Sequence, residues 1–308
     1  MATKTAGGAL PPVKIGIDLG GTKIEVIAMD DSGQELLRRR VRTPQSDYTA
    51  ILNAIVDLIH YAERRIGTEY TIGIGTPGAL SRTTGKLKNS NSTCLNGTPI
   101  LDDLERLIGR PARMSNDANC FALSEAVDGS GAGAFVVFGV IIGTGCGAGI
   151  VVNGSVITGV NGVAGEWGHN PLPWAADEER PGPDCYCGKR GCIETYLSGP
   201  GMARDHQVSA GRKMRPETIV QRASAGDAAS EATMARYEDR MARALAHVIN
   251  ILDPDVIVLG GGMSNIERLY ENVPRLWDRY VFSDAVDTKL LPARHGDSSG
   301  VRGAAWLW

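Results

Sequence analysis

Apolar runs and glycine turns follow the same order in two parts of the chain. In the first part, residues 13–18 are apolar, Gly20, Gly21 and Thr22 predict a tight turn, and residues 24–29 and 36–41 predict two more strands. In the second part, the apolar residues 135–142 precede a turn at 143–147, and residues 149–152 lead to Asn153 and Gly154, a pair favoured in two-residue hairpins. The repetition predicts the same unit of strand, glycine turn and strand twice.

Helical periodicity follows each of these units. Asp47 can cap a helix over residues 48–66, whose apolar side chains recur on one face. Residues 229–252 predict a long helix that ends before Asp253 and Pro254, followed by a strand over 256–260 and a helix from about Ile266. This order of elements predicts an α/β fold of two domains with mixed sheets and a cleft between them.

Composition and charge narrow the class of protein. The chain has 308 residues, of which 43% are hydrophobic, and its formal net charge of -3 comes with no long basic run. The electrostatic footprint of a nucleic-acid binder is therefore missing. No apolar run approaches the roughly 20 residues of a membrane span, and residues 1–12 lack the apolar core of a signal peptide and predict a loose tail. We expect a globular cytoplasmic protein with no nucleic-acid or membrane partner.

Residues 166–194 combine metal ligands with polar side chains that suit a small molecule. His169, Cys185, Cys187 and Cys192 make a complete tetrahedral zinc set, and a zinc site with no open position is structural. Six cysteines without a signal peptide disfavour a disulfide framework, and three reduced cysteines that lie close by chance are the other alternative. We expect the metal to hold a loop that presents Glu166 and Glu194 to a ligand. The acidic run at 177–180 predicts a solvated part of that loop.

Both glycine turns are candidates for binding phosphate, because glycine lets backbone N–H groups approach an anion closely. Neither turn has a common nucleotide fingerprint, since both lead into a strand where those fingerprints require a helix. An ordinary hairpin turn is the alternative for each. A third cluster, Gly260, Gly261 and Gly262, follows a predicted strand and precedes a helix, where α/β sheets usually bind ligands.

Six motifs in a fixed order make the chain similar to a known family. They are Asp18-Leu-Gly-Gly-Thr-Lys23, Gly75-Thr-Pro-Gly78, Asn116-Asp-Ala-Asn119, Gly143-Thr-Gly-Cys-Gly147, Gly165-Glu-Trp-Gly-His169 and Cys185-x-Cys-x4-Cys192. Together they resemble the ROK family of bacterial sugar kinases and repressors, from about Val13 to Trp308. Residues 89–97, 167–174 and 295–303 look most similar to the bacterial fructokinases of mannokinase type, although Cys94 stands where that subgroup is expected to have Trp.

The resemblance implies an actin-like ATPase (ribonuclease H-like) fold, in which two domains flank a cleft. The smaller domain would span residues 13–118 and be joined by a C-terminal helix at 294–308, and the larger would span 119–293. ATP with Mg²⁺ would lie across the cleft, and Asp18 would organise the Mg²⁺ or its water. The implied nucleotide contacts are Asp18, Gly20, Gly21, Thr22, Lys23, Thr144, Gly145, Gly261 and Gly262.

Phosphoryl transfer to a sugar needs a carboxylate that accepts the proton of the attacking hydroxyl. The resemblance assigns this role to Asp117, which from the residues alone could equally cap a helix over 122–127. His169 would bind zinc through one ring nitrogen and a sugar hydroxyl through the other. The implied hexose contacts are Gly78, Asn91, Asn116, Asp117, Glu166, His169 and Glu194.

The subgroup resemblance implies that D-fructose is converted to fructose 6-phosphate. A glucokinase, a mannokinase or an N-acetylglucosamine kinase of the same family is the alternative, and homodimers are common in the family. A repressor would carry a helix-turn-helix domain before the first turn, where only 12 residues precede Val13. A sugar-binding module without catalysis could lose Asp117 or the phosphate turns, which this chain keeps. We expect an active kinase.

Overall fold

The computed structural model describes residues 13–67 and 69–308. The tail predicted at residues 1–12 lies outside these residues. The chain divides into two compact units: the first runs up to Cys120 and takes in Gly300–Trp308, and the second is Phe121–Ser299. No helix in the described residues is long and apolar enough to cross a membrane.

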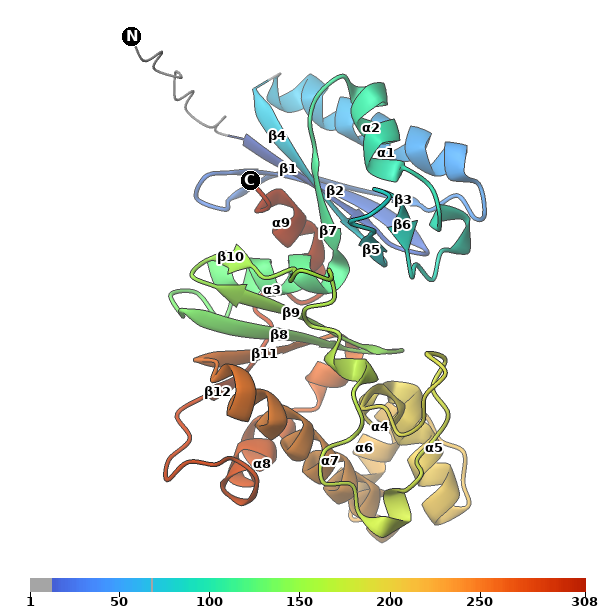
Figure 1. The fold of residues 1–308 in the computed structure, drawn as a ribbon, viewed down its shortest axis with the longest axis vertical. Coiled ribbons are helices and arrows are strands. Elements are labelled where there is room, and N and C mark those ends of the chain that lie inside the picture. Colours follow the sequence, from blue (N-terminus) through green and yellow to red (C-terminus); the bar gives the residue numbers. More distant parts are fainter. Residues whose placement is uncertain (1–12, 68) are drawn as a thin grey trace. The chain divides into compact units, whose positions relative to one another are not determined.

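The first unit is a five-stranded sheet with helices on both faces (Figure 1). Its elements are β1 (Val13–Leu19), β2 (Lys23–Asp30), β3 (Glu35–Arg42), α1 (Tyr48–Ile66), β4 (Tyr70–Thr76), β5 (Ala79–Leu80), β6 (Leu87–Lys88), η1 (Thr93–Leu95), α2 (Ile100–Ile108), β7 (Arg113–Asn116), the start of α3 (Asp117–Val127) and nearly all of α9 (Ser299–Ala305). The strand order is β3-β2-β1-β4-β7, and β1 runs antiparallel to β2 and parallel to β4. The sheet is therefore mixed.

Each face of this sheet has its own apolar packing. Ile24, Val26 and Ala28 of β2 pack in the cluster that contains the buried side chains of α1. Ile27 and Met29 point the other way and pack on Val301 and Ala305 of α9. The pattern follows from the alternation of side chains along a strand. The predicted helix over 48–66 is confirmed, with the Asp47 side chain accepting from the Ala50 backbone N.

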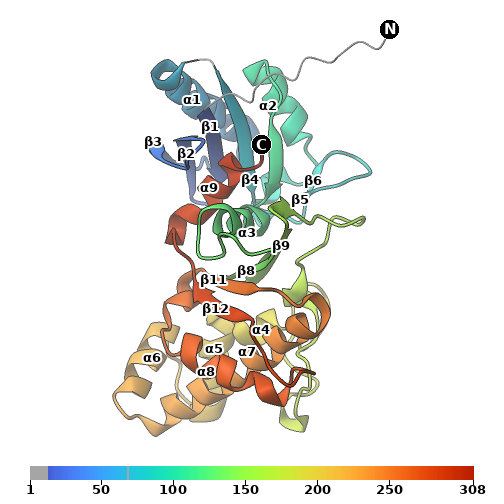
Figure 2. The same cartoon turned by 90° about the vertical axis from the view of Figure 1, so that its left-hand side faces the viewer.

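The second unit repeats the architecture with a mixed sheet of order β10-β9-β8-β11-β12. Its elements are the rest of α3, β8 (Val136–Ile142), β9 (Cys146–Val152), β10 (Ser155–Val156), η2 (Trp167–His169), η3 (Asp177–Glu179), α4 (Glu194–Leu197), α5 (Gly199–Ala210), α6 (Pro216–Ser224), α7 (Ala228–Leu252), β11 (Val256–Gly260), η4 (Gly262–Asn265), α8 (Leu269–Arg275), η5 (Trp277–Arg279), β12 (Lys289–Pro292) and η6 (Gly296–Ser298). Helices α7 and α8 cover one face, and the part of α3 after Cys120 lies on the other (Figure 2).

Both predicted hairpins with a glycine turn are present. β1 pairs with β2 around the turn at Gly20, and β8 pairs with β9 around the turn at Gly143. The predicted long helix ends at Leu252 and is followed by Asp253 in a left-handed conformation. The helix expected from about Ile266 begins later, at Leu269, because a 3-10 turn first occupies residues 262–265.

Candidate functional site

The turn after β1 exposes backbone that can meet an anion. The Gly20 backbone N donates to the Lys23 carbonyl at 2.9 Å, which closes the turn. Outside it, the Thr43 hydroxyl donates to the Gly20 carbonyl at 2.7 Å and the Gln45 side chain donates to the Gly21 carbonyl at 2.9 Å. These bonds hold the two carbonyls toward Thr43 and Gln45, while Gly21 and Thr22 are exposed.

Asp18 lies at the base of this turn in a crowded acidic environment. Burial, followed by the neighbouring charges of Asp117 and Glu25, raises the pKa of Asp18 to about 6. The folded state therefore holds this proton more tightly than the unfolded chain, so its stability falls as the pH rises from about 4 to 6. Above that range Asp18 is a carboxylate, the form that can bind a hard cation or its water.

Asn116 and Asp117 stand where β7 ends and α3 begins. The Asn116 side chain accepts from the Asn119 backbone N at 2.8 Å, which is the geometry of a helix N-cap. The Asp117 carboxylate accepts from its neighbour Ala118 at 2.8 Å. The helix thus begins at Asp117, five residues before the predicted 122–127, and the capping role left open for Asp117 belongs to Asn116.

Gly78 and Asn91 belong to loops of the first unit. Gly78 has φ 82°, and a Cβ there would collide with the Lys88 carbonyl. Asn91 is exposed on a loop that Asn96 closes, because Asn96 accepts from the Ser90 N at 2.8 Å and donates to the Ser90 carbonyl at 2.9 Å. Cys94, on the same loop, is partly buried against the core of the first unit. A side chain at this position therefore packs on that core.

In the second unit, two glycines press the segment around Glu166 onto β9. A Cβ at Gly165 would collide with the Ala148 carbonyl, and one at Gly168 would collide with the Cys146 carbonyl. Between them Trp167 is buried edge-on against Phe138, with ring centroids 5.6 Å apart. The buried indole anchors the loop, and Glu166 on its outer side is exposed.

Glu194 connects the metal segment to the second glycine turn. It is the first residue of α4, two positions after Cys192, and its Oε2 accepts from the Cys146 backbone N at 3.0 Å. A Cβ at Gly145 would lie 2.6 Å from the same oxygen, so the carboxylate packs directly on glycine backbone.

The other glycines expected near the nucleotide lie at the same edge of this sheet. Thr144 is exposed in the turn that the Gly143 N closes on the Gly145 carbonyl at 2.9 Å. Gly261 has φ 80° and stands against the Ile142 backbone, where a Cβ would lie 2.5 Å from the carbonyl oxygen. The second unit thus brings Thr144, Gly145, Gly261 and Gly262 together at the carboxyl ends of β8 and β11.

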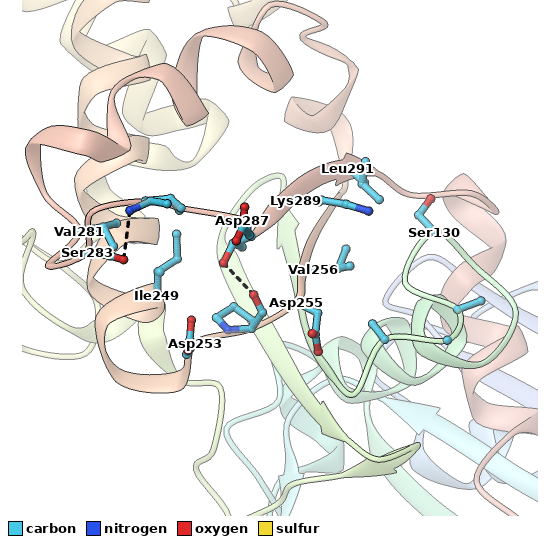
Figure 3. Close-up of a pocket in the computed structure, with 17 residues that line it drawn as sticks. Ser130, Ile249, Asp253, Asp255, Val256, Val281, Ser283, Asp287, Lys289 and Leu291 are labelled. Atoms are coloured by element: carbon cyan, nitrogen blue, oxygen red, sulfur yellow. Dashed lines mark hydrogen bonds between the residues drawn. The ribbon is translucent and has the colours of Figure 1, made fainter.

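A cavity of about 710 Å³ lies at the opposite edge of the same sheet (Figure 3). Its lining includes Val256 and Lys289, the first residues of β11 and β12, Ser130 from the segment between α3 and β8, and Asp253 and Asp287 from the adjoining loops. None of the predicted site residues lines it.

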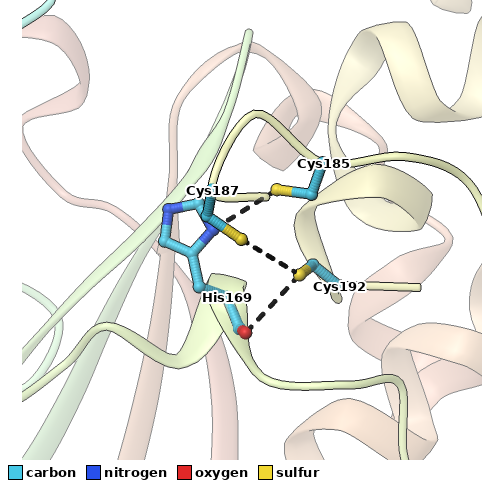
Figure 4. A group of neighbouring side chains, drawn as sticks. All are labelled: His169, Cys185, Cys187 and Cys192. Atoms are coloured by element: carbon cyan, nitrogen blue, oxygen red, sulfur yellow. Dashed lines mark hydrogen bonds between the residues drawn. The ribbon is translucent and has the colours of Figure 1, made fainter. Parts of the chain in front are cut away.

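The four predicted metal ligands converge in the second unit (Figure 4). The ligand atoms of His169, Cys185, Cys187 and Cys192 all lie within 4.8 Å of one another. Zinc–sulfur bonds of about 2.3 Å put the corners of a tetrahedron about 3.8 Å apart, and slightly less where one ligand is nitrogen. The Cys187 and Cys192 sulfurs are 3.6 Å apart, and the Cys185 sulfur is 3.5 Å from His169 Nδ1. These spacings fit a structural zinc ion.

The second nitrogen of His169 meets a protein group. Nε2 lies 2.9 Å from the Tyr186 hydroxyl, and the two rings meet edge-on with centroids 5.0 Å apart. A sugar hydroxyl that binds Nε2 has to share it with Tyr186 or displace Tyr186, whose side chain is 84% exposed. Sequence reasoning missed this residue, although it stands between two of the cysteines.

One prediction tests the metal site. Replacing Cys187 with Ser should remove zinc from the purified protein and weaken hexose affinity by ~10- to 100-fold, because the ion holds the loop that carries Glu166 and Glu194. Elemental analysis should find one zinc per chain in the original protein and in the control Cys94→Ser, whose sulfur lies outside the cluster. Protein prepared without chelators that contains no metal would refute the zinc site.

The prediction of a solvated loop at 177–180 is confirmed for Asp177, Glu178 and Arg180, which are exposed, and is wrong for Glu179. The Glu179 side chain is only 7% exposed and pairs with Arg240 at 2.7 Å and Arg243 at 2.9 Å, both from α7. Burial alone would raise its pKa, but hydrogen bonds from these two guanidinium groups lower the pKa to about 2. The segment between His169 and Cys185 is therefore fastened to α7 as well as to the metal ligands.

Comparison with known proteins identifies the family. The ROK family model matches residues 14–308. The chain is 40% identical over 301 residues to the N-acetyl-D-glucosamine kinase of Pasteurella multocida, which covers 96% of this chain and 99% of that protein. The enzyme of the same name from Vibrio cholerae is 39% identical over 296 residues and covers 95% of this chain and 98% of that protein.

Solved structures agree. The ROK hexokinase from Thermus thermophilus superposes with a TM-score of 0.85 at 32% identity, over 96% of this chain and 97% of that one. A ROK family glucokinase from Streptomyces griseus, solved with glucose and AMPPNP, gives a TM-score of 0.73 at 27% identity, over 95% and 98%. Fold and site define an ATP-dependent hexose kinase with the actin-like ATPase fold. The chain belongs to the ROK family.

Proposed function

We propose that this kinase transfers the γ-phosphoryl group of ATP to N-acetyl-D-glucosamine. The observation that carries the proposal is the similarity, along nearly the whole chain and at 39–40% identity, to proteins named for that activity. These relatives lend no support to fructose, the acceptor expected from short stretches of sequence.

The loop before Glu166 carries exposed apolar side chains, the kind of side chain that an acetamido methyl group packs against. Ile157, Val160 and Val163 are 40%, 79% and 50% exposed, and all three precede Glu166 by fewer than ten residues. Single exposed apolar side chains are ordinary, and these three bear on the acceptor because they share a short loop with a candidate sugar contact. Fructose has no methyl group to place there.

The proposed chemistry assigns one task to each group. Asp117 accepts the proton of the sugar hydroxyl, while the hydroxyl oxygen bonds to the γ-phosphorus and ADP leaves. Asp18 and the backbone of Gly20, Gly21, Thr22 and Lys23 bind the phosphate end, and Mg²⁺ supplies charge neutralisation on the phosphate oxygens. On the second unit Thr144, Gly145, Gly261 and Gly262 contact the nucleotide. The proposed hexose contacts are Gly78, Asn91, Asn116, Asp117, Glu166, His169 and Glu194.

The homodimer implied by the resemblance stays a prediction, and the molar mass of the purified protein from light scattering tests it.

The acceptor is tested by steady-state kinetics with four hexoses at saturating Mg-ATP. We expect kcat/KM for N-acetyl-D-glucosamine to exceed the values for glucose, mannose and fructose by tenfold or more, which corresponds to about 1.4 kcal/mol in transition-state binding. ADP release in the absence of sugar serves as the background. Equal or higher kcat/KM for any of the other three would overturn the assignment and leave the hexose kinase chemistry intact.

A further inference from the structure

Three charged side chains form a row across the first unit's sheet. Asp18 of β1 stands directly opposite Glu25 of β2, and Glu25 stands directly opposite Arg40 of β3. Residues that face each other in register lie on the same side of a sheet. The row therefore starts at the acid below the glycine turn and ends at an arginine on the edge strand.

The middle member of the row is unusually placed for a carboxylate. The Glu25 side chain is fully buried, with 0% exposure, next to the acid Asp18. Burying a charge costs free energy unless it is paired, and like charges opposite each other repel. Glu25 is paired on one side only, since Arg40 Nε lies 2.7 Å from Oε2 and Arg38 Nη1 lies 3.1 Å from Oε1. Arg38 also donates a hydrogen bond to Oε1, so both guanidinium groups lie beside the buried acid.

The arginines of β3 form a line that begins next to the glycine turn. Arg38, Arg40 and Arg42 alternate along β3 and so share one side of the sheet, and Arg42 is opposite Lys23, the last residue of the turn motif. The Arg40 side chain is 44% exposed although its Nε forms an ion pair with the buried Glu25. A planar guanidinium held in one direction suits bidentate contact with phosphate oxygens.

Charge on an edge strand has another common explanation. Charged side chains on an edge strand prevent pairing with other chains. Arg39 suits that explanation, because it points to the opposite side and lies over the Tyr61 ring at 4.2 Å. Protection of an edge gives no reason for a fully buried Glu25, since solvated arginines would serve equally well.

We propose that Arg40 binds the polyphosphate chain of the nucleoside triphosphate and that Glu25 is the positioning residue that aims it. The proposal rests on the proposed function, because it takes the turn at Gly20–Lys23 as the phosphate site. The polyphosphate would then be bound by a side chain of β3 as well as by the backbone groups of the turn.

The test compares Arg40→Ala with the matched control Arg39→Ala, which removes the same charge from the same strand on the other side. We expect Arg40→Ala to raise KM for Mg-ATP by ~10- to 100-fold, because one hydrogen-bonded contact to a charged group is lost. The KM for the hexose should change less than twofold. The dissociation constant of inorganic tripolyphosphate, measured by calorimetry, should rise in parallel. Arg40→Lys should recover part of the loss, and Arg39→Ala should behave as the unmodified protein.

Glu25→Gln separates positioning from a purely structural role. It should raise KM for Mg-ATP in the same direction as Arg40→Ala while thermal unfolding stays cooperative. If Arg40→Ala leaves KM for Mg-ATP and tripolyphosphate binding unchanged, or shifts them no more than Arg39→Ala does, the inference is wrong. Should Arg40→Ala fail to fold, an Arg40→Lys protein with unaltered nucleotide KM would refute it equally. A different preferred hexose would overturn the acceptor assignment alone, since the nucleotide measurements can be made with any hexose that is phosphorylated.

Discussion

Asp117→Asn is expected to lower kcat by ~10²- to 10⁴-fold, the usual effect of removing a general base. The structure makes this substitution informative, because Asn116 and not Asp117 provides the N-cap of α3. The amide has nearly the size of the carboxylate and can still accept from the Ala118 N. Fold and hexose affinity should therefore persist, as measured by thermal unfolding and by equilibrium binding of the sugar.

Asp47→Ala is a suitable control for this experiment. Asp47 is a helix cap, whose side chain accepts from the Ala50 N at 2.9 Å, so its loss should cost about 1 kcal/mol of stability and leave turnover unaffected. If Asp117→Asn retained nearly full turnover, the proton would go to another group and the base would have to be assigned elsewhere.

Glu179→Ala is expected to destabilise the protein by ~1–3 kcal/mol at neutral pH, because Arg240 and Arg243 lose their shared carboxylate while each keeps a second acid, Asp205 or Asp239. Their side chains are 7% and 6% exposed. The pKa of Glu179 is lowered to about 2 in the folded state, so its contribution is complete above the unfolded value near 4.5 and is lost as the pH falls toward 2. Urea unfolding at pH 7 measures the loss.

The neighbouring Glu178 gives the matched control, since it is exposed on the same turn. Glu178→Ala should change the free energy of unfolding by less than about 0.5 kcal/mol. An equally small change for Glu179→Ala would mean that the buried pairs contribute nothing to stability, contrary to the geometry.

The elements that the sequence predicted well are those with local signals. Alternating apolar runs around glycine turns gave β1, β2, β8 and β9, and the periodic apolar face after Asp47 gave α1. The sequence also predicted that the four metal ligands come together, because their residue types suit one metal ion and three of them lie within eight residues.

The features that the sequence did not reveal depend on partners distant along the chain. In the sequence, Glu179 stands among charged residues that are typical of a solvated loop. In the structure it is buried against arginines about 60 residues later in the chain. The row from Asp18 to Arg40 exists only once the strand register is known. The sequence did contain one signal for it, the alternation of Arg38, Arg40 and Arg42 within a single strand.

The acceptor was harder to predict than the reaction. Phosphoryl transfer requires the same groups for any hexose, whereas the choice of sugar depends on how a few side chains meet one substituent. Short stretches such as residues 89–97 suggested fructose, whereas the proposed N-acetylated sugar rests on similarity along 96% of the chain to a protein named for that activity.

The most direct test is a competition between two sugars in one vessel. The purified protein receives equal concentrations of N-acetyl-D-glucosamine and D-fructose with limiting Mg-ATP, and mass spectrometry quantifies the two sugar phosphates, whose ratio equals the ratio of kcat/KM values. We predict at least a tenfold excess of phosphorylated N-acetyl-D-glucosamine. An excess of fructose phosphate, or equal amounts of the two products, would contradict the proposed function.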